Sequence, residues 1–272
     1  MIKALFLDVD GTIISIKTKK IPQSAVDAVS RIREKGVKVF ICTSRASQFL
    51  TNVTGFEYDG VVALTGAHCL DSSGRTLQTS PMNYEDIAAA LTDVKRSGRP
   101  FVVLTPDRVF IQEPYSPEIT DFFATGGLTV DEVPDVTFGI PDILSAGDPV
   151  AFAEKLGVLQ VTGFFPSGEE DRRFLALMPH SHSERWNERF VDIVGDGISK
   201  ANGIDVMARH FGFDISETMG VGDGANDIPM IRHAGVGVAM GNASDTVKQS
   251  ADFVTGEVDE DGLARAIEKY IL

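Results

Sequence analysis

The stretch Asp8-Val9-Asp10-Gly11-Thr12 decides how the rest of this sequence is interpreted. It directly follows a short apolar run, Ala4-Leu5-Phe6-Leu7, whose length predicts a strand buried on both faces. Carboxylates at the end of such a strand lie at the carboxyl edge of a parallel sheet, where open α/β folds bind their ligands. Because two carboxylates this close repel each other unless a cation is present, the stretch predicts a metal site and a candidate nucleophile.

The composition of the chain excludes several classes of partner. Its 272 residues include 25 Lys and Arg against 39 Asp and Glu, a net charge of −14. Nucleic acids and anionic membrane surfaces need patches of Lys and Arg, so we expect neither as a partner. A small anionic substrate is compatible with this charge, since a bound cation inverts the local field. The sequence does not indicate an oligomeric state.

The cysteines and the first residues predict a cytoplasmic protein. Two cysteines, Cys42 and Cys69, are too few for a disulfide framework and predict buried, inert thiols. The first residues become acidic too early for a signal peptide. In addition, no apolar stretch approaches the length of a membrane span.

Strands and helices alternate in the first and last thirds of the sequence, and this alternation predicts parallel strand pairing. In the first third we expect a strand at 4–7, a helix between Pro22 and Gly36, strands at 37–42 and 61–64, and a hairpin turn at 71–74. In the last third we expect a helix at 204–211, strands at 218–222 and 236–240, and an amphipathic C-terminal helix at 263–271.

The middle of the chain has a different pattern and predicts an inserted α+β domain. We expect a helix at 84–94, a strand pair at 101–105 and 109–112, helices that begin at Pro117 and Pro149, and strands at 157–164 and 174–178. This region holds no candidate catalytic cluster. We therefore predict a discontinuous α/β core of residues 1–81 and 187–272, interrupted by a domain of residues 82–186.

Asp8 and Asp10 suit phosphoryl transfer. A carboxylate is a competent nucleophile toward phosphorus and forms an aspartyl-phosphate. A second carboxylic acid protonates the leaving oxygen and later activates water. The alternative is an acidic turn in which Asp10 only caps the next segment.

A second acidic motif, Gly222-Asp223-Gly224-Ala225-Asn226-Asp227, follows a predicted strand near the C-terminus. Asp8, the carbonyl of Asp10 and Asp223 would supply the oxygen ligands that Mg²⁺ prefers, and Asp227 would orient them without binding the ion. Residues 220–225, which overlap this motif, also match the dinucleotide fingerprint G-x-G-x-x-A. We disfavour a nicotinamide or flavin site, because Asp223 would repel the pyrophosphate.

Three other side chains are candidate phosphate ligands. The hydroxyl of Thr43, at the end of a predicted strand, can bind a phosphate oxygen, and Arg45 offers a planar fork of donors for an anion. Lys200, just before a predicted helix, would neutralise a phosphoryl group. The alternative for Thr43 is an ordinary helix cap, and the alternative for Arg45 is a solvated surface residue. Lys200 is one lysine among many and carries little information by itself.

The motifs and their order resemble the haloacid dehalogenase-like hydrolases, most closely the Cof-like sugar-phosphatase branch with its type-B cap. The motifs that carry the resemblance are D-V-D-G-T at 8–12, T-S-R at 43–45, Lys200, G-D-G-A-N-D-I-P-M at 222–230 and G-V-A-M-G-N-A at 237–243. The resemblance implies a Rossmann-like parallel-sheet core, an α+β cap and Mg²⁺ as cofactor.

The resemblance also implies a role for each matching residue. Asp8 is the nucleophile and Asp10 the general acid/base. Ser44, where the branch usually has glycine, is grouped with the substrate-binding candidates. Thr43, Lys200 and Asn226 match phosphate-binding residues. Asp223 matches a metal ligand, and Asp227 matches the acid that orients the metal ligands.

The implied activity is a Mg²⁺-dependent hydrolase of small phosphate monoesters, with sugar phosphates as the expected substrates. A phosphomutase with the same site is the first alternative, and a non-catalytic sugar-phosphate-binding protein is the second. Thr65 stands where the branch often has asparagine, so neither Ser44 nor Thr65 supports a finer assignment of substrate.

Overall fold

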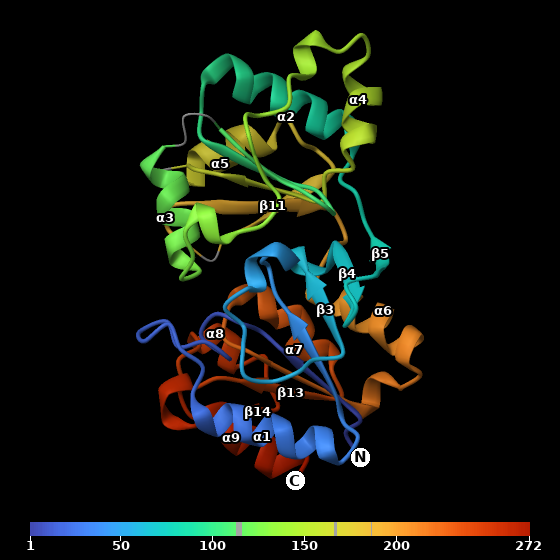
Figure 1. The fold of residues 1–272 in the computed structure, drawn as a ribbon, viewed down its shortest axis with the longest axis vertical. Coiled ribbons are helices and arrows are strands. Elements are labelled where there is room, and N and C mark those ends of the chain that lie inside the picture. The colour runs from blue at the N-terminus through green and yellow to red at the C-terminus, as the bar shows by residue number, and fades with distance from the viewer. Residues whose placement is uncertain (113–115, 166–167, 186) are drawn as a thin grey trace. The chain divides into compact units, whose positions relative to one another are not determined.

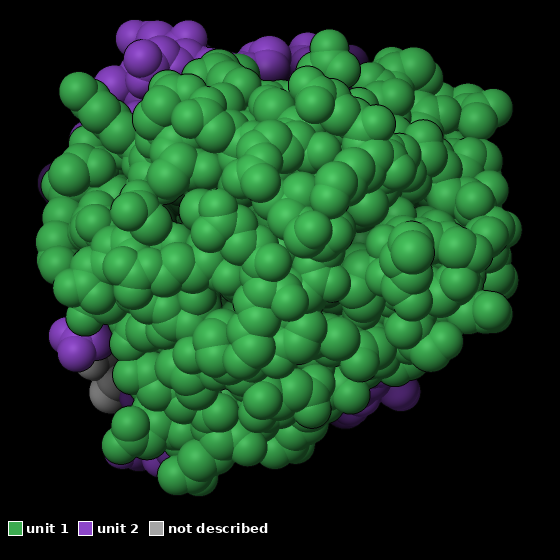
Figure 2. Space-filling view, turned by 90° about the horizontal axis from the view of Figure 1, so that it is seen from below, with its two compact units in different colours: residues 1–78, 199–272 green, residues 79–198 purple. Residues whose placement is uncertain are grey.

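A computed structural model describes residues 1–112, 116–165, 168–185 and 187–272 of the chain (Figure 1). The chain divides into two units, Met1–Gln78 with Ser199–Leu272, and Thr79–Ile198 (Figure 2). The α/β fold class expected from the sequence is confirmed. The expected domain division stays a prediction, and residue 186, the expected end of the inserted domain, lies outside the described residues.

The sheet of the first unit is mostly parallel. Its strands, in spatial order, are β14 (Phe253–Val254), β13 (Val236–Ala239), β12 (Thr218–Gly222), β1 (Ala4–Leu7), β2 (Lys38–Cys42), β3 (Gly60–Ala63), β4 (His68–Asp71) and β5 (Thr76–Thr79). Strands β14 to β3 pair in parallel, and β4 runs antiparallel to β3. Consequently β1 and β12, which precede the two acidic motifs, are neighbours and end at the same edge.

Helices pack on the faces of this sheet. On one face, Phe6 and Phe40 stack with ring centroids 4.8 Å apart and share a buried cluster with α6 (Lys200–Phe211) and α7 (Ile228–His233). Alternation along β1 directs Leu5 and Leu7 to the opposite face. Helix α1 (Gln23–Glu34) contacts β2 and packs beside α9 (Gly262–Tyr270) (Figure 1). The short helix α8 (Asp245–Lys248) lies between β13 and β14 in the sequence.

The second unit is an α+β structure around a mostly antiparallel sheet, in which only the pair β7 and β8 is parallel among the described strands. Its strands, in spatial order, are β10 (Ser181–Glu184), β11 (Val191–Gly195), β9 (Gln160–Gly163), β6 (Phe101–Leu104), β7 (Val109–Ile111) and β8 (Val136–Phe138). Its helices are α2 (Tyr84–Ser97), α3 (Pro117–Thr125), α4 (Pro149–Leu156) and α5 (Gly168–Leu175). One buried cluster joins α2, α4 and α5 to the sheet. No helix in the described parts of either unit is both long and apolar enough to cross a bilayer.

One expected strand is wrong. Residues 174–178 do not form a strand: Phe174 and Leu175 end α5, and a turn leads to β10. A short apolar run fits a strand and the buried end of a helix equally well, so its hydrophobicity could not distinguish them. Phe174 and Met178, four residues apart, both lie in the buried cluster of the second unit.

Two glycines bring α6 close to the end of β3. A β-carbon on Gly66, which has φ +106°, would lie 2.3 Å from the carbonyl oxygen of Ser199, the residue before α6. A β-carbon on Gly203 within α6 would lie 2.1 Å from a methyl carbon of Val62 on β3. Because neither residue has a side chain, α6 can pack close to β3. This packing places the first residue of α6, Lys200, at the edge of the sheet.

We expect Gly66→Ala to destabilise the protein more than Gly74→Ala does. Both glycines have positive φ, but a β-carbon on Gly74 would meet nothing within 4 Å. At Gly74 the positive φ alone should lower the free energy of unfolding by about 1–2 kcal/mol once a β-carbon is present. The clash with the backbone of Ser199 should add at least about 1 kcal/mol at Gly66. Urea unfolding of the two variants measures the difference, and equal losses would contradict the close packing described here.

Candidate active site

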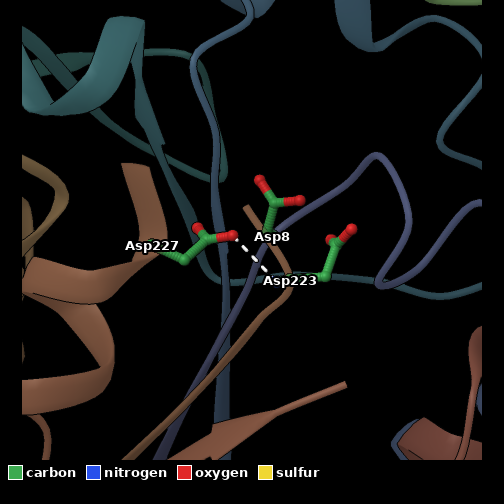
Figure 3. A group of neighbouring side chains, drawn as sticks. All are labelled: Asp8, Asp223 and Asp227. Atoms are coloured by element: carbon green, nitrogen blue, oxygen red, sulfur yellow. Dashed lines mark hydrogen bonds between the residues drawn. The ribbon is translucent and has the colours of Figure 1, made fainter. Parts of the chain in front are cut away.

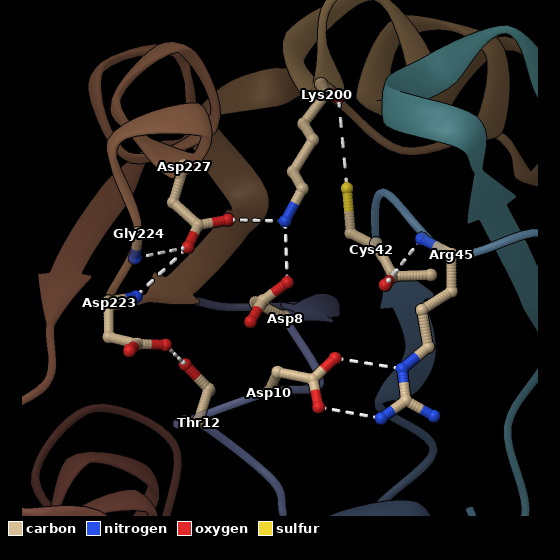
Figure 4. Close-up of polar contacts among 10 residues, drawn as sticks. Asp8, Asp10, Thr12, Cys42, Arg45, Lys200, Asp223, Gly224 and Asp227 are labelled. Atoms are coloured by element: carbon tan, nitrogen blue, oxygen red, sulfur yellow. Dashed lines mark hydrogen bonds and ion pairs between the residues drawn. The ribbon is translucent and has the colours of Figure 1, made fainter. Parts of the chain in front are cut away.

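The turn after β1 separates the first two carboxylates. The amide of Asp8 still donates to Val221 on β12 (3.0 Å), but the carbonyl of Val9 then accepts the amides of Ile13 and Ile14. Gly11, at φ +90°, completes the reversal. Because the chain turns instead of continuing as a strand, the side chains of Asp8 and Asp10 reach different partners (Figure 4).

Lys200 joins the two acidic motifs. Its side chain is fully buried, and its Nζ lies 2.6 Å from Oδ1 of Asp8 and 2.5 Å from Oδ1 of Asp227 (Figure 4). Burial by itself would lower the pKa of Lys200, but the carboxylates of Asp227 and then Asp8 outweigh burial and raise it. The ammonium is therefore held charged between the two carboxylates.

Asp227 shapes the loop that carries Asp223. Its Oδ2 accepts the backbone amides of Asp223 (2.9 Å) and Gly224 (2.8 Å), while Oδ1 accepts from Lys200. A β-carbon on Gly222 would lie 2.4 Å from Cγ of Asp227, so glycine is required there. Both oxygens of Asp227 thus bind protein donors, an arrangement suited to positioning.

Asp223 contacts the turn after β1. Its Oδ1 accepts a hydrogen bond from the hydroxyl of Thr12 at 3.0 Å, and its Oδ2 accepts one from the side-chain Nδ2 of Asn242 at 3.1 Å. A β-carbon on Gly11 would lie only 2.2 Å from Oδ2 of Asp223. The two motifs, more than 200 residues apart in sequence, therefore meet as their positions at strand ends predict.

Three carboxylates form a cluster suited to a cation. Asp8, Asp223 and Asp227 each offer an oxygen, and these oxygens lie within 4.8 Å of one another (Figure 3). Burial, and then the charge of Asp227, raises the pKa of Asp8 well above its usual value and that of Asp223 to about 7. One ammonium does not balance three carboxylates. The carboxylate oxygens, two of them from buried residues, and the excess negative charge therefore fit a hard divalent cation.

Arg45 forms an ion pair with Asp10. Its Nε and Nη2 donate to the two carboxylate oxygens of Asp10 at 2.7 and 2.6 Å, a bidentate pair (Figure 4). Its Nη1 donates to the carbonyl of Phe49 and to Oδ1 of Asn52, both at 3.0 Å, and the residue is 7% exposed. The sequence predicts a substrate ligand at this position, and in the structure the guanidinium of Arg45 is paired with Asp10.

The remaining candidates surround these groups at the ends of β2 and β12. Thr43 is buried, and its hydroxyl accepts the amide of Arg45 at 3.1 Å, so its proton is directed elsewhere. Ser44, between them, is half-buried. Asn226 is buried in the short turn that begins at Ala225. Cys42 is also buried, and burial raises the pKa of its thiol well above the usual value, which makes it a poor nucleophile.

The sequence interpretation gave no role to two residues that contact Asp223. Thr12 belongs to the first quoted motif, and Asn242 belongs to the stretch Gly241-Asn242-Ala243. Both motifs were visible in the sequence, but nothing in the sequence identifies Asp223 as the shared partner. A hydrogen bond between loops that follow different strands requires the register of the sheet.

The chain is similar to known proteins over nearly its whole length. A family model described as haloacid dehalogenase-like hydrolase matches residues 5–267. The putative phosphatase YkrA of Bacillus subtilis is 31% identical over 271 residues, which cover 98% of this chain and 97% of YkrA.

Solved structures also cover almost the whole chain. The subclass IIB sugar phosphatase BT4131 is 32% identical, with a TM-score of 0.84 and 98% of both chains covered. The phosphatase BT1666 from Bacteroides thetaiotaomicron is 33% identical, with a TM-score of 0.81, and the match covers 99% of this chain and 95% of BT1666.

We expect the stability of the metal-free protein to fall as the pH rises from about 4 to about 7. The folded pKa of Asp223 is about 7, against 3.8 for the ordinary group. In this window the folded state therefore holds a proton that the unfolded state has lost. Each pH unit should then lower the free energy of unfolding by up to about 1.4 kcal/mol through this group.

The control is Asp223→Asn, which lacks the titrating group. Both proteins are unfolded in urea with a chelator present, at about pH 5 and about pH 7. The free energy of unfolding of the variant should rise relative to that of the parent as the pH increases. A difference between the two proteins that stays constant with pH would contradict the assigned shift.

Proposed function

The chain belongs to the haloacid dehalogenase-like hydrolases and is a phosphatase, and we propose that it hydrolyses small phosphate monoesters through a phosphoryl group carried on Asp8. The observation that carries this proposal is the buried carboxylate of Asp8, 2.6 Å from Lys200 and grouped with Asp223 and Asp227. A cation and an ammonium beside one carboxylate suit attack on a phosphorus atom that bears negative oxygens.

The proposed reaction has two steps. An oxygen of Asp8 forms a bond to phosphorus while the bond to the ester oxygen breaks, and Asp10 gives its proton to the departing oxygen. Asp10, now a carboxylate, takes a proton from water as the water oxygen attacks phosphorus. The bond between phosphorus and Asp8 breaks, inorganic phosphate leaves, and Asp8 is again a carboxylate.

Each surrounding residue has a proposed task in this sequence. Lys200 orients Asp8 and attracts the phosphoryl oxygens, and the hydroxyl of Thr43 donates to one of them. Arg45 holds Asp10 by two hydrogen bonds, which fix the orientation of its carboxyl group. Asn226 is proposed as a further contact of the phosphoryl group.

We propose Mg²⁺ as the cofactor. Asp8, Asp223 and the carbonyl of Asp10 would hold it, with Asp227 supporting the loop of Asp223. Mg²⁺, when bound, neutralises charge that develops on the phosphoryl oxygens. The excess of carboxylates over the one lysine in the cluster supports this proposal.

We propose further that residues 82–186 form a cap that selects the leaving group, and that sugar phosphates are the substrates. The similarity to a subclass IIB sugar phosphatase over 98% of the chain supports this substrate class. The free thiols of Cys42 and Cys69 support the expected cytoplasmic location, since disulfides are rare there.

We expect Asp8→Asn to lower phosphate release from a panel of sugar phosphates by at least about a thousandfold, because the amide is not a nucleophile. A chelator should abolish the activity of the parent protein, and Mg²⁺ should restore it. Asp205→Asn, at a surface carboxylate that contacts His233, is the matched control and should keep full activity.

Analysis of the products separates the alternatives. Inorganic phosphate in proportion to substrate consumed supports the hydrolase. An isomeric sugar phosphate would indicate a phosphomutase, and binding without turnover in Mg²⁺ would indicate a non-catalytic protein. Substantial activity in the Asp8→Asn variant would refute the proposed nucleophile.

The contact between Arg45 and Asp10 predicts a dependence on the leaving group. A nitrophenolate leaves without a proton, whereas an alkoxide needs one, so a residue that orients the general acid matters more for alkyl esters. Arg45→Ala should lose at least about tenfold more kcat/KM on a sugar phosphate than on nitrophenyl phosphate.

The control for this test is a second arginine, Arg33, in the same unit. Arg33→Ala removes a guanidinium that binds Asp59 and should leave the ratio of the two kcat/KM values unchanged. If Arg45 instead binds the phosphoryl group, as the sequence alone suggested, Arg45→Ala will affect both esters equally, and the positioning role will be wrong.

A further inference from the structure

The loop after β13 is fixed by its backbone on two sides. The amide of Met240 donates to the carbonyl of Gly222 at 3.0 Å, at the end of β12. The amide of Gly241 donates to the carbonyl of Gly256 at 2.9 Å, and a β-carbon on Gly241 would lie 2.6 Å from the nitrogen of Glu257. The next residue, Asn242, is exposed, yet the backbone on either side holds it beside Asp223.

The side-chain amide of Asn242 has a defined orientation. Its Oδ1 accepts the amide of Val258 at 3.0 Å, and its Nδ2 donates to the carbonyl of Gly11 at 2.9 Å and to Oδ2 of Asp223 at 3.1 Å. Val258 offers only a donor, whereas Gly11 and Asp223 offer only acceptors. The chemistry of its three partners therefore fixes which end of the amide faces Asp223.

Asn242 links the two acidic motifs, because it donates to Gly11 in the first and to Asp223 in the second. A carbonyl and a carboxylate that face each other are two acceptors, and the Nδ2 group supplies the donor that both need. Thr12 donates to the other oxygen of Asp223, so each oxygen of this carboxylate has one donor. A carboxylate oxygen has a second lone pair, which leaves each oxygen able to bind a cation.

We propose that Asn242 is a positioning residue for the divalent cation: it fixes the rotamer of Asp223 and ties it to the turn that carries Asp8 and Asp10. The proposal rests on the proposed function, in which Asp223 binds Mg²⁺. Groups that hydrogen-bond a metal-binding carboxylate typically change metal affinity about 10–100-fold when removed. Asn242 touches neither the reacting atoms nor the ion, so its effect should be on affinity and not on the chemical step.

The test is direct titration of the full-length protein with Mg²⁺ by calorimetry, without substrate. We expect Asn242→Ala to raise the Kd for Mg²⁺ about tenfold. At saturating Mg²⁺ its kcat on a sugar phosphate should be within about threefold of the parent, because the missing hydrogen bond is offset by mass action. Ser244→Ala, in the same loop at a position without a side-chain capping bond, is the matched control and should change neither value.

The titration also separates folding from positioning. Unfolded protein lowers the number of sites per chain, whereas a displaced Asp223 raises the Kd of the sites that remain. The hydroxyl in Asn242→Ser is too short to reach the same partners, so this variant should show the same loss of Mg²⁺ affinity. It replaces the alanine variant in the titration if the alanine variant does not fold.

Two results would overturn the proposal. One is a Kd within about twofold of the parent in folded Asn242 variants, and the other is a large loss of kcat at saturating Mg²⁺ with unchanged affinity. If the parent itself binds no Mg²⁺, the proposed function fails together with this inference, whereas a parent that binds normally and variants that match it refute the inference alone.

Discussion

The site depends on one ammonium group buried between two carboxylates. Lys200 is inaccessible to solvent and lies within 2.6 Å of both Asp8 and Asp227. A buried charge is tolerated only when it is paired, and here Lys200 pairs with two carboxylates of a cluster that contains three. Burial, and then the remaining negative charge, keeps the pKa values of Asp8 and Asp223 high, and this excess negative charge favours the binding of a cation in the cluster.

The fold supplies this arrangement through short loops at one edge of a parallel sheet. Strands β1 and β12 are hydrogen-bonded neighbours, so the motifs that follow them meet although they lie at opposite ends of the sequence. Glycines at 11, 66 and 222 then allow approaches that a β-carbon would prevent. The loops that carry Asp8, Asp223 and Lys200 are therefore closely packed, an arrangement that limits reorganisation during the proposed reaction.

The parts of the site that follow from strand order could be predicted from the sequence. Asp8 and Asp223 each end an apolar run, and the carboxyl ends of parallel strands share one edge. The partner of Arg45 could not be predicted, because the direction of a side chain after a strand depends on the turn. The contact of Asn242 with Asp223 depends on the register of β12 and β13, which no local pattern encodes. Residues 174–178 were misassigned because a short apolar run carries no period.

Anomalous diffraction from crystals soaked in Mn²⁺, used in place of Mg²⁺, tests the central claim most directly. We expect one ion bonded to an oxygen of Asp8 and an oxygen of Asp223. Lys200 should stay on Asp227, and the second oxygen of Asp227 should stay on the amides of 223 and 224. A cluster that binds no ion in active crystals, or an ion held elsewhere on the chain, would contradict the claim that the excess charge of these carboxylates is balanced by a divalent cation.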